Sequence, residues 1–410
     1  MRGNFIEKVF QSKLINRSKV VFVGTMMSQL ITFVTSFVIT AYFTPEDLGL
    51  LGTLTALISI IAGTLSFRLD LAIIQADKDE SATVFLQSTI LSGLACTLFC
   101  LACFFLPWSF AQKITSFFFP FVVWCWGYNF FFNSKQLPFR YDELRISSAA
   151  VIYKSLFVLI FQLLGGWINP TFSWLISGRI IGDFVGGFVH IKSYFRSINL
   201  RNATSGWLKF LKKHSDNILY VTPHHLCLAL SNNIIIFFLE RSYGLATVGF
   251  FALGQRLIQA PLEMVGSTLF NVTIQRFSEL KDHPSDLRHF YLKIVVFSLF
   301  ISSAIGIIIW GTIDFFIPVL GEKWLGAAPM VKNLIPYFMS ILFVTPTTNF
   351  LRFINRSRLQ LNLELFELAI KLSFLFLIRF SSSESMVLNY SLLAFGLSFL
   401  KTTIVFRLIK

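Results

Sequence analysis

Twelve apolar runs of about 20 residues recur along the chain and constrain its fold more than any other feature. A helix of about 20 apolar residues spans the ~30 Å hydrocarbon core of a bilayer and satisfies its own backbone hydrogen bonds there. The alternating pattern of β-barrel strands is absent. We place the spans at residues 20–43, 48–67, 82–106, 114–133, 147–166, 171–189, 217–239, 246–269, 290–311, 330–350, 360–379 and 386–406. The sequence therefore predicts an all-α polytopic membrane protein with about 12 transmembrane helices.

The composition leaves no place for a soluble catalytic domain. Of 410 residues, 55% are hydrophobic and 14% charged, and 49 Phe are spread over the whole chain. The net charge of +14 would suggest nucleic acid in a soluble protein, but loop topology explains it better here, so we expect no nucleic-acid partner. Adjacent His224 and His225 point about 100° apart on a helix, and Cys100 and Cys103 lack acidic or His partners nearby. We expect no metal site and no cofactor.

Basic residues in the loops lie almost entirely on one side of the predicted membrane. One side carries Arg2, Lys8, Lys13, Arg17, Lys19, Arg68, Lys78, Lys135, Arg140, Arg145, Lys192, Arg196, Arg201, Lys209, Lys212, Lys213, Arg276, Lys281, Arg288, Arg352, Arg356, Arg358, Arg407 and Lys410. The other side carries Lys113, Arg241, Lys323 and Arg379. Because cytoplasmic loops collect Lys and Arg, this ratio of 24 to 4 predicts an even number of spans with both termini cytoplasmic. The first apolar run is too long for a cleavable signal peptide.

The longest polar stretch between spans, residues 190–216, divides the chain in the middle. We predict an N-terminal lobe at 1–200 with spans 1 to 6 and a C-terminal lobe at 201–410 with spans 7 to 12. A shift of 200 residues places Val248-Gly249-Phe250 on Leu48-Gly49-Leu50, which suggests a parallel repeat. Duplicated bundles with a site between their halves are typical of transporters. The short outer loops argue against a membrane-embedded glycan polymerase or ligase, and we do not expect an enzyme.

Several predicted spans carry charged or amide side chains at mid-membrane depth, where charges usually face an interior. They are Lys154, Gln162, Arg179, Asp183, Gln255, Arg256, Gln259, Glu263, Glu364, Glu367 and Lys371. Arg179–Asp183 and Glu367–Lys371 are spaced i, i+4, so each is either a self-neutralised pair or part of a site. Arg256 has no acidic residue within four positions and ranks first as a functional residue. Lys293, Lys332 and Lys401 lie near span ends, where we expect their long stems to snorkel to the interface.

Four segments carry a resemblance to a known family. They are Tyr42 to Gly49 (YFTPEDLG), Phe67 to Ile74 (FRLDLAII) with acidic Asp77 to Glu80, Ala252 to Ile258 (ALGQRLI) with Pro261-Leu262, and Gly321 to Ala328 (GEKWLGAA) leading into Pro336-Tyr337. In their order and spacing over nearly the whole chain, these segments resemble those of bacterial polysaccharide and O-antigen flippases. That family belongs to the multidrug/oligosaccharidyl-lipid/polysaccharide exporter superfamily.

The resemblance implies a two-lobed, MATE-like exporter fold in the bacterial inner membrane. It implies translocation of an undecaprenyl-pyrophosphate-linked oligosaccharide, such as an O-antigen or lipopolysaccharide repeat unit, towards the periplasm. It allows membrane lipids, a glycan polymerase and chain-length proteins as partners. Cationic residues in the cavity of such proteins hold the anionic head group, in agreement with the candidates Arg256, Arg179, Lys154 and Lys371, beside Gln255. Arg68 either shares that role or fixes the end of its helix through Asp70.

A pyrophosphate suits these residues, because guanidinium binds phosphate oxygens bidentately and stays charged. Glu263, Glu367 and Asp183 are candidates for coupling to a proton or sodium gradient, since a buried carboxyl can change protonation. The alternative is a cation-coupled drug exporter of the same superfamily, which would be expected to have a net acidic cavity. The other alternative is the glycan polymerase or ligase already disfavoured by the short loops.

The charge asymmetry of the loops yields a topology prediction. Reporter fusions after Asn199 and after Lys410 should report cytoplasm, and fusions near Gly166 and Ser382 should report periplasm. Alkaline phosphatase and fluorescent-protein activities measure the two locations. A periplasmic C-terminus would contradict both the even span number and the six-plus-six organisation.

Overall fold

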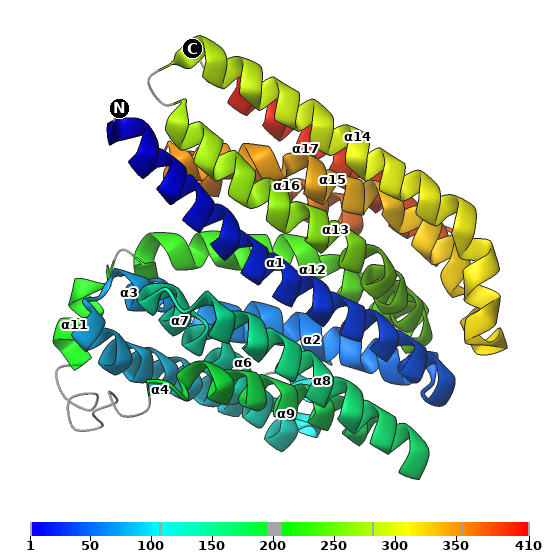
Figure 1. Ribbon diagram of the computed structural model, residues 1–410. Coiled ribbons are helices and arrows are strands. Elements are labelled where there is room, and N and C mark those ends of the chain that lie inside the picture. Colours follow the sequence, from blue (N-terminus) through cyan, green and yellow to red (C-terminus); the bar gives the residue numbers. More distant parts are fainter. Residues whose placement is uncertain are drawn as a thin grey trace. The chain divides into compact units, whose positions relative to one another are not determined.

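The structure, a computed structural model, describes residues 2–105, 109–194, 207–215, 217–280, 283–354 and 356–408. The regular structure in these ranges is helical, as Figure 1 shows. The helices are α1 (Arg2–Tyr42), α2 (Pro45–Leu65), α3 (Asp70–Gln75), α4 (Lys78–Ala102), α5 (Ser109–Ser116), α6 (Phe118–Ser134), α7 (Gln136–Tyr141), α8 (Leu144–Ile168), α9 (Phe172–Ile191), α11 (Trp207–Lys213), α12 (Thr222–Tyr243), α13 (Leu245–Glu279), α14 (Pro284–Phe316), α15 (Ala327–Phe353), α16 (Ser357–Leu377) and α17 (Ser383–Phe406). The predicted all-α fold class is confirmed.

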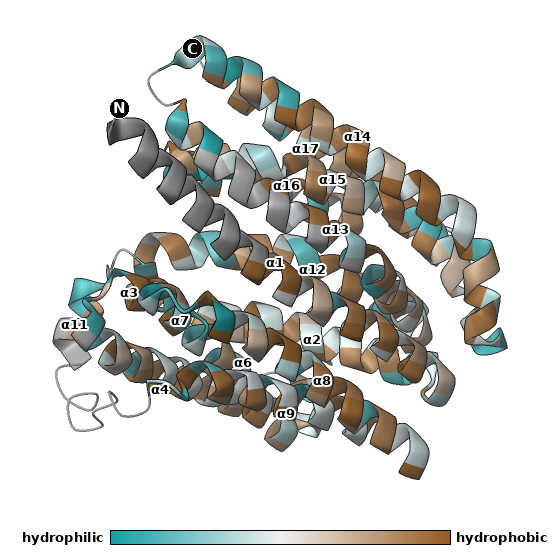
Figure 2. Ribbon diagram, in the orientation of Figure 1, coloured by the Kyte–Doolittle hydropathy of each residue, from teal (hydrophilic) through white to brown (hydrophobic). Residues whose placement is uncertain are grey.

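Each of the twelve predicted spans overlaps one of the helices α1, α2, α4, α6, α8, α9 and α12 to α17. Within the described ranges, nine helical segments are long and apolar enough to cross a membrane. The three long helices outside that set are α6, α13 and α16. Helix α6 has only 17 residues. The apolar run of α13 is interrupted by Gln255, Arg256 and Gln259, and α16 carries the charged residues Glu364, Glu367 and Lys371. Figure 2 shows apolar residues predominating along helices such as α8 and α14.

The start of α2 is specified locally by the sequence Thr-Pro-Glu-Asp. Pro45 occupies the first helical position, where its missing N–H is no loss. The Thr44 Oγ1 accepts a hydrogen bond from the Asp47 N–H at 3.2 Å, and the Asp47 carboxylate accepts one from the Thr44 N–H at 3.1 Å. This reciprocal capping satisfies free backbone donors at the helix start, so α1 ends and α2 begins within a few residues.

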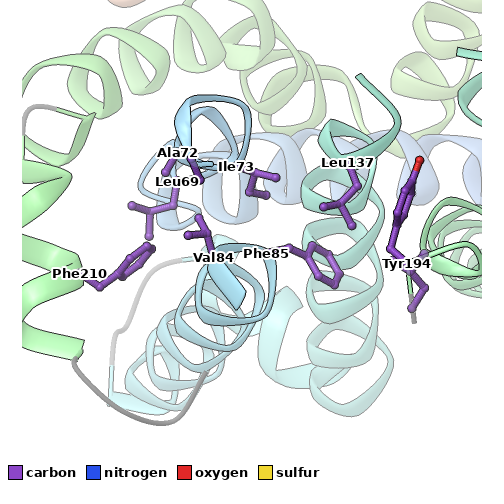
Figure 3. Close-up of a cluster of buried hydrophobic side chains, with 10 residues drawn as sticks. Leu69, Ala72, Ile73, Val84, Phe85, Leu137, Tyr194 and Phe210 are labelled. Carbon is purple, nitrogen blue, oxygen red and sulfur yellow. The ribbon is translucent and has the colours of Figure 1, made fainter. Parts of the chain in front are cut away.

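The chain forms two compact units, and each is described by itself. Unit 1 contains residues 1–32, 57–165 and 173–222, and unit 2 contains residues 33–56, 166–172 and 223–410. In unit 1, α4 packs on α6, and α3 packs on α4 and α7. Figure 3 shows Leu69, Ala72 and Ile73 of the α3 segment beside Val84 and Phe85 of α4, with Phe210 of α11 in the same apolar cluster. The predicted division into lobes at residue 200 stays a prediction.

In unit 2, α15 is the central helix and packs against α13, α14 and α17. An aromatic cluster joins these helices at one end of the unit. The ring of Phe277 in α13 meets the rings of Phe350 in α15 and Tyr291 in α14. The Tyr291 hydroxyl shares a hydrogen bond of 2.8 Å with Thr347 of α15, so the polar tip of the buried tyrosine is satisfied.

Within unit 2, α2 and α13 approach each other so closely that two positions accept only glycine. A Cβ at Gly49 would lie 1.9 Å from the carbonyl oxygen of Leu245, and a Cβ at Gly249 would lie 1.9 Å from that of Pro45. Both relations connect residues offset by about 200 positions, so the contact is reciprocal. Small residues at helix interfaces permit such backbone contact in membranes. The glycine that the sequence comparison aligned in each half is therefore the glycine at this crossing.

This crossing predicts a steric effect of adding one methyl group. Gly49→Ala or Gly249→Ala should force α2 and α13 apart and destabilise the protein by about 1–3 kcal/mol, the usual range for overpacking. Gly311→Ala in α14 is the matched control, because a Cβ there meets nothing within 4 Å. Thermal unfolding of the purified protein, followed by loss of the monodisperse chromatographic peak, measures the difference. Equal melting temperatures for the three variants would contradict the close crossing.

Candidate functional site

Asp183 on α9 is the centre of a buried polar cluster in unit 1. Its side chain is buried, and its Oδ1 lies 2.5 Å from the Nζ of Lys154 on α8. Its Oδ2 accepts a hydrogen bond of 3.0 Å from the indole Nε1 of Trp124 on α6. Helices α6 and α8 thus each contribute one polar group to the carboxylate on α9, and Arg179 lies one turn before Asp183 on the same helix. We call Lys154, Arg179, Asp183 and Trp124 the unit 1 cluster.

The partner of Asp183 differs from the expected one. The i, i+4 spacing predicts an ion pair with Arg179, but the carboxylate contacts Lys154 from the neighbouring helix. Gly182 explains the difference, because a Cβ there would lie 2.9 Å from the Lys154 carbonyl oxygen and 2.6 Å from a methyl group of Val158. Because Gly182 has no side chain, α8 packs close to α9, and Lys154 rather than Arg179 forms the ion pair with Asp183.

Arg179 is left with unused hydrogen-bonding capacity. Asp183 acts on its guanidinium electrostatically, yet the buried Nε of Arg179 has no hydrogen-bond partner in the described structure. Buried N–H groups are nearly always paired, so an unpaired one on a cation marks a place for a ligand or water. The unit 1 cluster contains two cations and one carboxylate and therefore has an excess positive charge.

An aromatic ring also contacts Lys154. Its Nζ lies 3.9 Å from the centre of the Phe131 ring of α6, a favourable cation–π distance. The same ring packs against the buried His190 of α9, with centroids 5.2 Å apart. The His190 Nδ1 lies 3.0 Å from the Ser134 Oγ, which fixes the imidazole against α6. Gln162, another mid-membrane candidate, donates to the Leu175 carbonyl oxygen and so joins α8 to α9.

At the end of α2, Arg68 fixes the turn into α3. Phe67 and Arg68 have φ angles of 51° and 49°, a left-handed backbone that non-glycine residues adopt at some cost. The Arg68 Nε and Nη2 donate to the two oxygens of Asp70 at 3.1 and 3.3 Å, and Gln136 donates to Asp70 at 3.3 Å. Burial raises the pKa of Asp70, and the Arg68 guanidinium opposes that rise. This contact accounts for the Arg68–Asp70 motif as a helix-end device.

A second buried polar cluster lies in unit 2, between α12, α16 and α17. The Lys371 Nζ donates to the Glu367 Oε1 at 2.6 Å and to the Ser231 Oγ at 2.9 Å. The Lys401 Nζ donates to the Glu364 Oε1 and lies 3.9 Å from the Glu367 Oε2. Lys371, Lys401 and Glu364 are buried. We call Glu364, Glu367, Lys371 and Lys401 the unit 2 tetrad; it holds two positive and two negative charges.

The tetrad includes one residue that sequence reasoning misplaced. Because Lys401 lies near a span end, the sequence predicts that its side chain snorkels to the interface. That prediction is wrong: only 6% of Lys401 is exposed, and its ammonium group contacts Glu364. In the sequence, Glu364 has no basic residue nearby on its own helix that is left to pair with it. This feature could have predicted an ion pair with a lysine on another helix. Lys332, by contrast, forms a pair of 2.5 Å with the exposed Asp314.

The remaining candidates lie on α13. Gln255 and Arg256 are half-buried, and Arg256 interacts with other groups of the protein. Gln259 is exposed, and the side chain of Glu263 lies outside the described part of the structure. Among the described residues, no group of three or more His, Cys, Asp or Glu side chains could hold a metal ion, and the five cysteines are buried free thiols.

Comparison with known proteins identifies the family. The sequence profile of the family described as "Polysaccharide biosynthesis protein" matches residues 38–329, more than half of the chain. The chain belongs to this family. No curated protein matches the chain. The resemblance to polysaccharide exporters found in the sequence is thereby confirmed.

Solved structures show the same fold at low identity. An inward-facing multidrug resistance MATE family transporter of the MOP superfamily matches with a TM-score of 0.71 and 14% identity, covering 96% of this chain and 98% of that one. An outward-facing multidrug resistance MATE family transporter matches with a TM-score of 0.67 and 13% identity, covering 96% of this chain and 94% of that one. A mutant of the Vibrio cholerae MATE transporter VcmN matches with a TM-score of 0.61 and 13% identity, covering 97% of this chain and 96% of that one. The family and the fold are those of multi-pass membrane exporters, not of catalytic enzymes.

The tetrad predicts unequal effects of removing one charge or a pair. Lys401→Met leaves the buried Glu364 uncompensated and should destabilise the protein by about 3–5 kcal/mol. The double variant Lys401→Met/Glu364→Gln removes both charges and should recover most of that loss. Lys332→Met is the control, since a pair with an exposed partner contributes about 0–1 kcal/mol. Thermal unfolding in detergent measures the series; a double variant as unstable as the single one would show that the charges are not coupled.

Proposed function

We propose that this exporter moves a polyprenyl-pyrophosphate-linked oligosaccharide from the cytoplasmic to the periplasmic leaflet of the bacterial inner membrane. The observation that carries the proposal is the excess positive charge of the unit 1 cluster, with its unpaired Arg179 donor. A pyrophosphate would supply the missing negative charge and accept the free N–H bond. Membership of a polysaccharide biosynthesis family supports an oligosaccharide load.

The proposed ligands of the head group are Arg179 and Lys154 in unit 1. Arg256 and Gln255 on α13 of unit 2 stay candidates predicted from the sequence. Asp183 holds Lys154 in place through their ion pair. Asp183, Glu367 and Glu263 are the proposed residues for coupling transport to an ion gradient. Transport proceeds by alternating access driven by an ion gradient, with both termini cytoplasmic and lobes at 1–200 and 201–410. The substrate repeat is O-antigen or another surface polysaccharide unit, with a glycan polymerase and chain-length proteins acting after release.

A multidrug exporter is the competing function, because the matched solved structures include multidrug transporters. The excess positive charge in the unit 1 cluster would repel a cationic drug. The sign of the buried charge therefore favours an anionic head group over a cationic drug.

Variants of Arg179 test the proposal. Arg179→Ala removes a charge-assisted donor worth about 1.5–3 kcal/mol and should slow transport of the lipid-linked substrate about ten- to hundredfold. Arg179→Lys should retain part of the rate, since the charge survives without the fork. Flipping of undecaprenyl-pyrophosphate-linked oligosaccharide in proteoliposomes is the measurement, and Arg379→Ala, on the predicted outer side, is the control.

Deletion of the gene separates the alternatives in cells. Loss of a flippase should leave lipid-linked repeat units on the cytoplasmic leaflet, whereas loss of a drug exporter should lower resistance and leave the polysaccharide intact. Normal polysaccharide in the deletion strain would overturn the proposed function. Full flipping activity of Arg179→Ala would overturn only the assignment of Arg179 to the head group.

A further inference from the structure

Both carboxylate oxygens of Asp183 are engaged by helices other than its own. The Oδ1 pairs with the Lys154 ammonium of α8, and the Oδ2 accepts the indole N–H of Trp124 of α6. Arg179 lies one turn before Asp183 on α9, at the i, i+4 spacing that allows an ion pair. Within the part of the chain that the structure describes, no hydrogen bond or ion pair joins these two side chains. The guanidinium on the carboxylate's own helix is therefore the group that it does not bind.

Close packing of α6 on α9 fixes the indole donor. A Cβ at Gly127, three residues after Trp124, would lie 3.1 Å from the Phe184 ring of α9. A Cβ at Gly187 of α9 would lie 2.3 Å from the Phe130 ring of α6. Small residues at helix interfaces permit such close packing in membranes. The two helices thereby hold the buried Trp124 N–H against the carboxylate.

We propose that Trp124 is a positioning residue of the head-group site. Its N–H holds the Asp183 carboxylate towards α6 and α8, so that this carboxylate does not neutralise Arg179, and the guanidinium stays available to an anion. The inference rests on the proposed function and names the residue that keeps the site selective for a negatively charged head group. Trp124 acts through Asp183 and Arg179 rather than by binding the ligand.

A carboxylate and a pyrophosphate compete for the same guanidinium. A pair between Arg179 and Asp183 would occupy the planar fork that binds two phosphate oxygens. The hydrogen bond from Trp124 opposes that pair, because a bond to an ionised acceptor is stronger than one between neutral groups. Without the indole N–H, one buried carboxylate oxygen would lack a donor, and buried polar atoms are nearly always paired. The Arg179 guanidinium, one turn away, would then become its partner.

Melting temperatures of the purified protein test the inference without any transported substrate. Arg179→Met should lower the melting temperature further in a Trp124→Phe background than in the wild type, because there the guanidinium has bonded to the freed carboxylate. Trp126→Phe is the matched control on the same helix, since its indole N–H is donated to Thr97 of α4 at 3.1 Å. Arg179→Met should have equal effects in the control background and in the wild type. Equal effects in all three backgrounds would overturn the proposal.

Binding of inorganic pyrophosphate supplies the second readout, since this ion carries the head-group charge without lipid or sugar. In nanodiscs of phosphatidylcholine, isothermal titration calorimetry should show about tenfold weaker binding for Trp124→Phe, the loss expected when one charge-assisted donor is withdrawn. Trp126→Phe should bind as the wild type does. In an Arg179→Met background, Trp124→Phe should cause no further loss, because the two residues act as a unit. Additive losses would show that Trp124 does not act through Arg179 and would overturn the proposal.

Replacement of Trp124 by benzothienylalanine separates the donor from the shape of the ring, because sulfur stands in place of the indole N–H. This variant should fold like the wild type and reproduce both effects of Trp124→Phe. Wild-type behaviour in both measurements would overturn the proposal.

The two readouts also separate the inference from the proposed function. If no variant and no wild-type protein binds pyrophosphate, yet the melting-temperature difference is present, the proposed head-group site is refuted and the role of Trp124 at Asp183 stands. If the wild type and the Trp124 variants bind pyrophosphate equally, the role of Trp124 is refuted and the proposed function stands.

Discussion

A charge inside a bilayer has to be compensated by the protein, because hydrocarbon offers neither water nor counter-ions. The two buried clusters meet this constraint in different ways. The unit 2 tetrad closes on itself, with two ammonium groups and two carboxylates in contact. The unit 1 cluster sets Lys154 and Arg179 against a single carboxylate and leaves one buried guanidinium N–H unpaired. The closed cluster neutralises its own charges, and the open one is suited to an anionic ligand.

The helices could be predicted from the sequence because each span is a local pattern. An apolar run of about 20 residues is sufficient in lipid, and the caps are also local, as Thr44 to Asp47 show at the start of α2. The charged partners could be predicted only within a helix. The Glu367–Lys371 contact follows from i, i+4 spacing and is present in the structure. Lys154–Asp183 and Lys401–Glu364 join residues on different helices, so local spacing could not find them.

Packing decides which of two available partners is chosen. Arg179 is the nearer cation to Asp183 along the chain, but Gly182 removes the side chain that would hold α8 away, and Lys154 takes the carboxylate. The glycines at the crossing of α2 and α13 act in the same manner. Gly49 and Gly249 are 200 residues apart, and each accepts the backbone of the other helix. The repeat is weak elsewhere in the sequence because apolar residues facing lipid can exchange freely, whereas a position without room for a Cβ cannot.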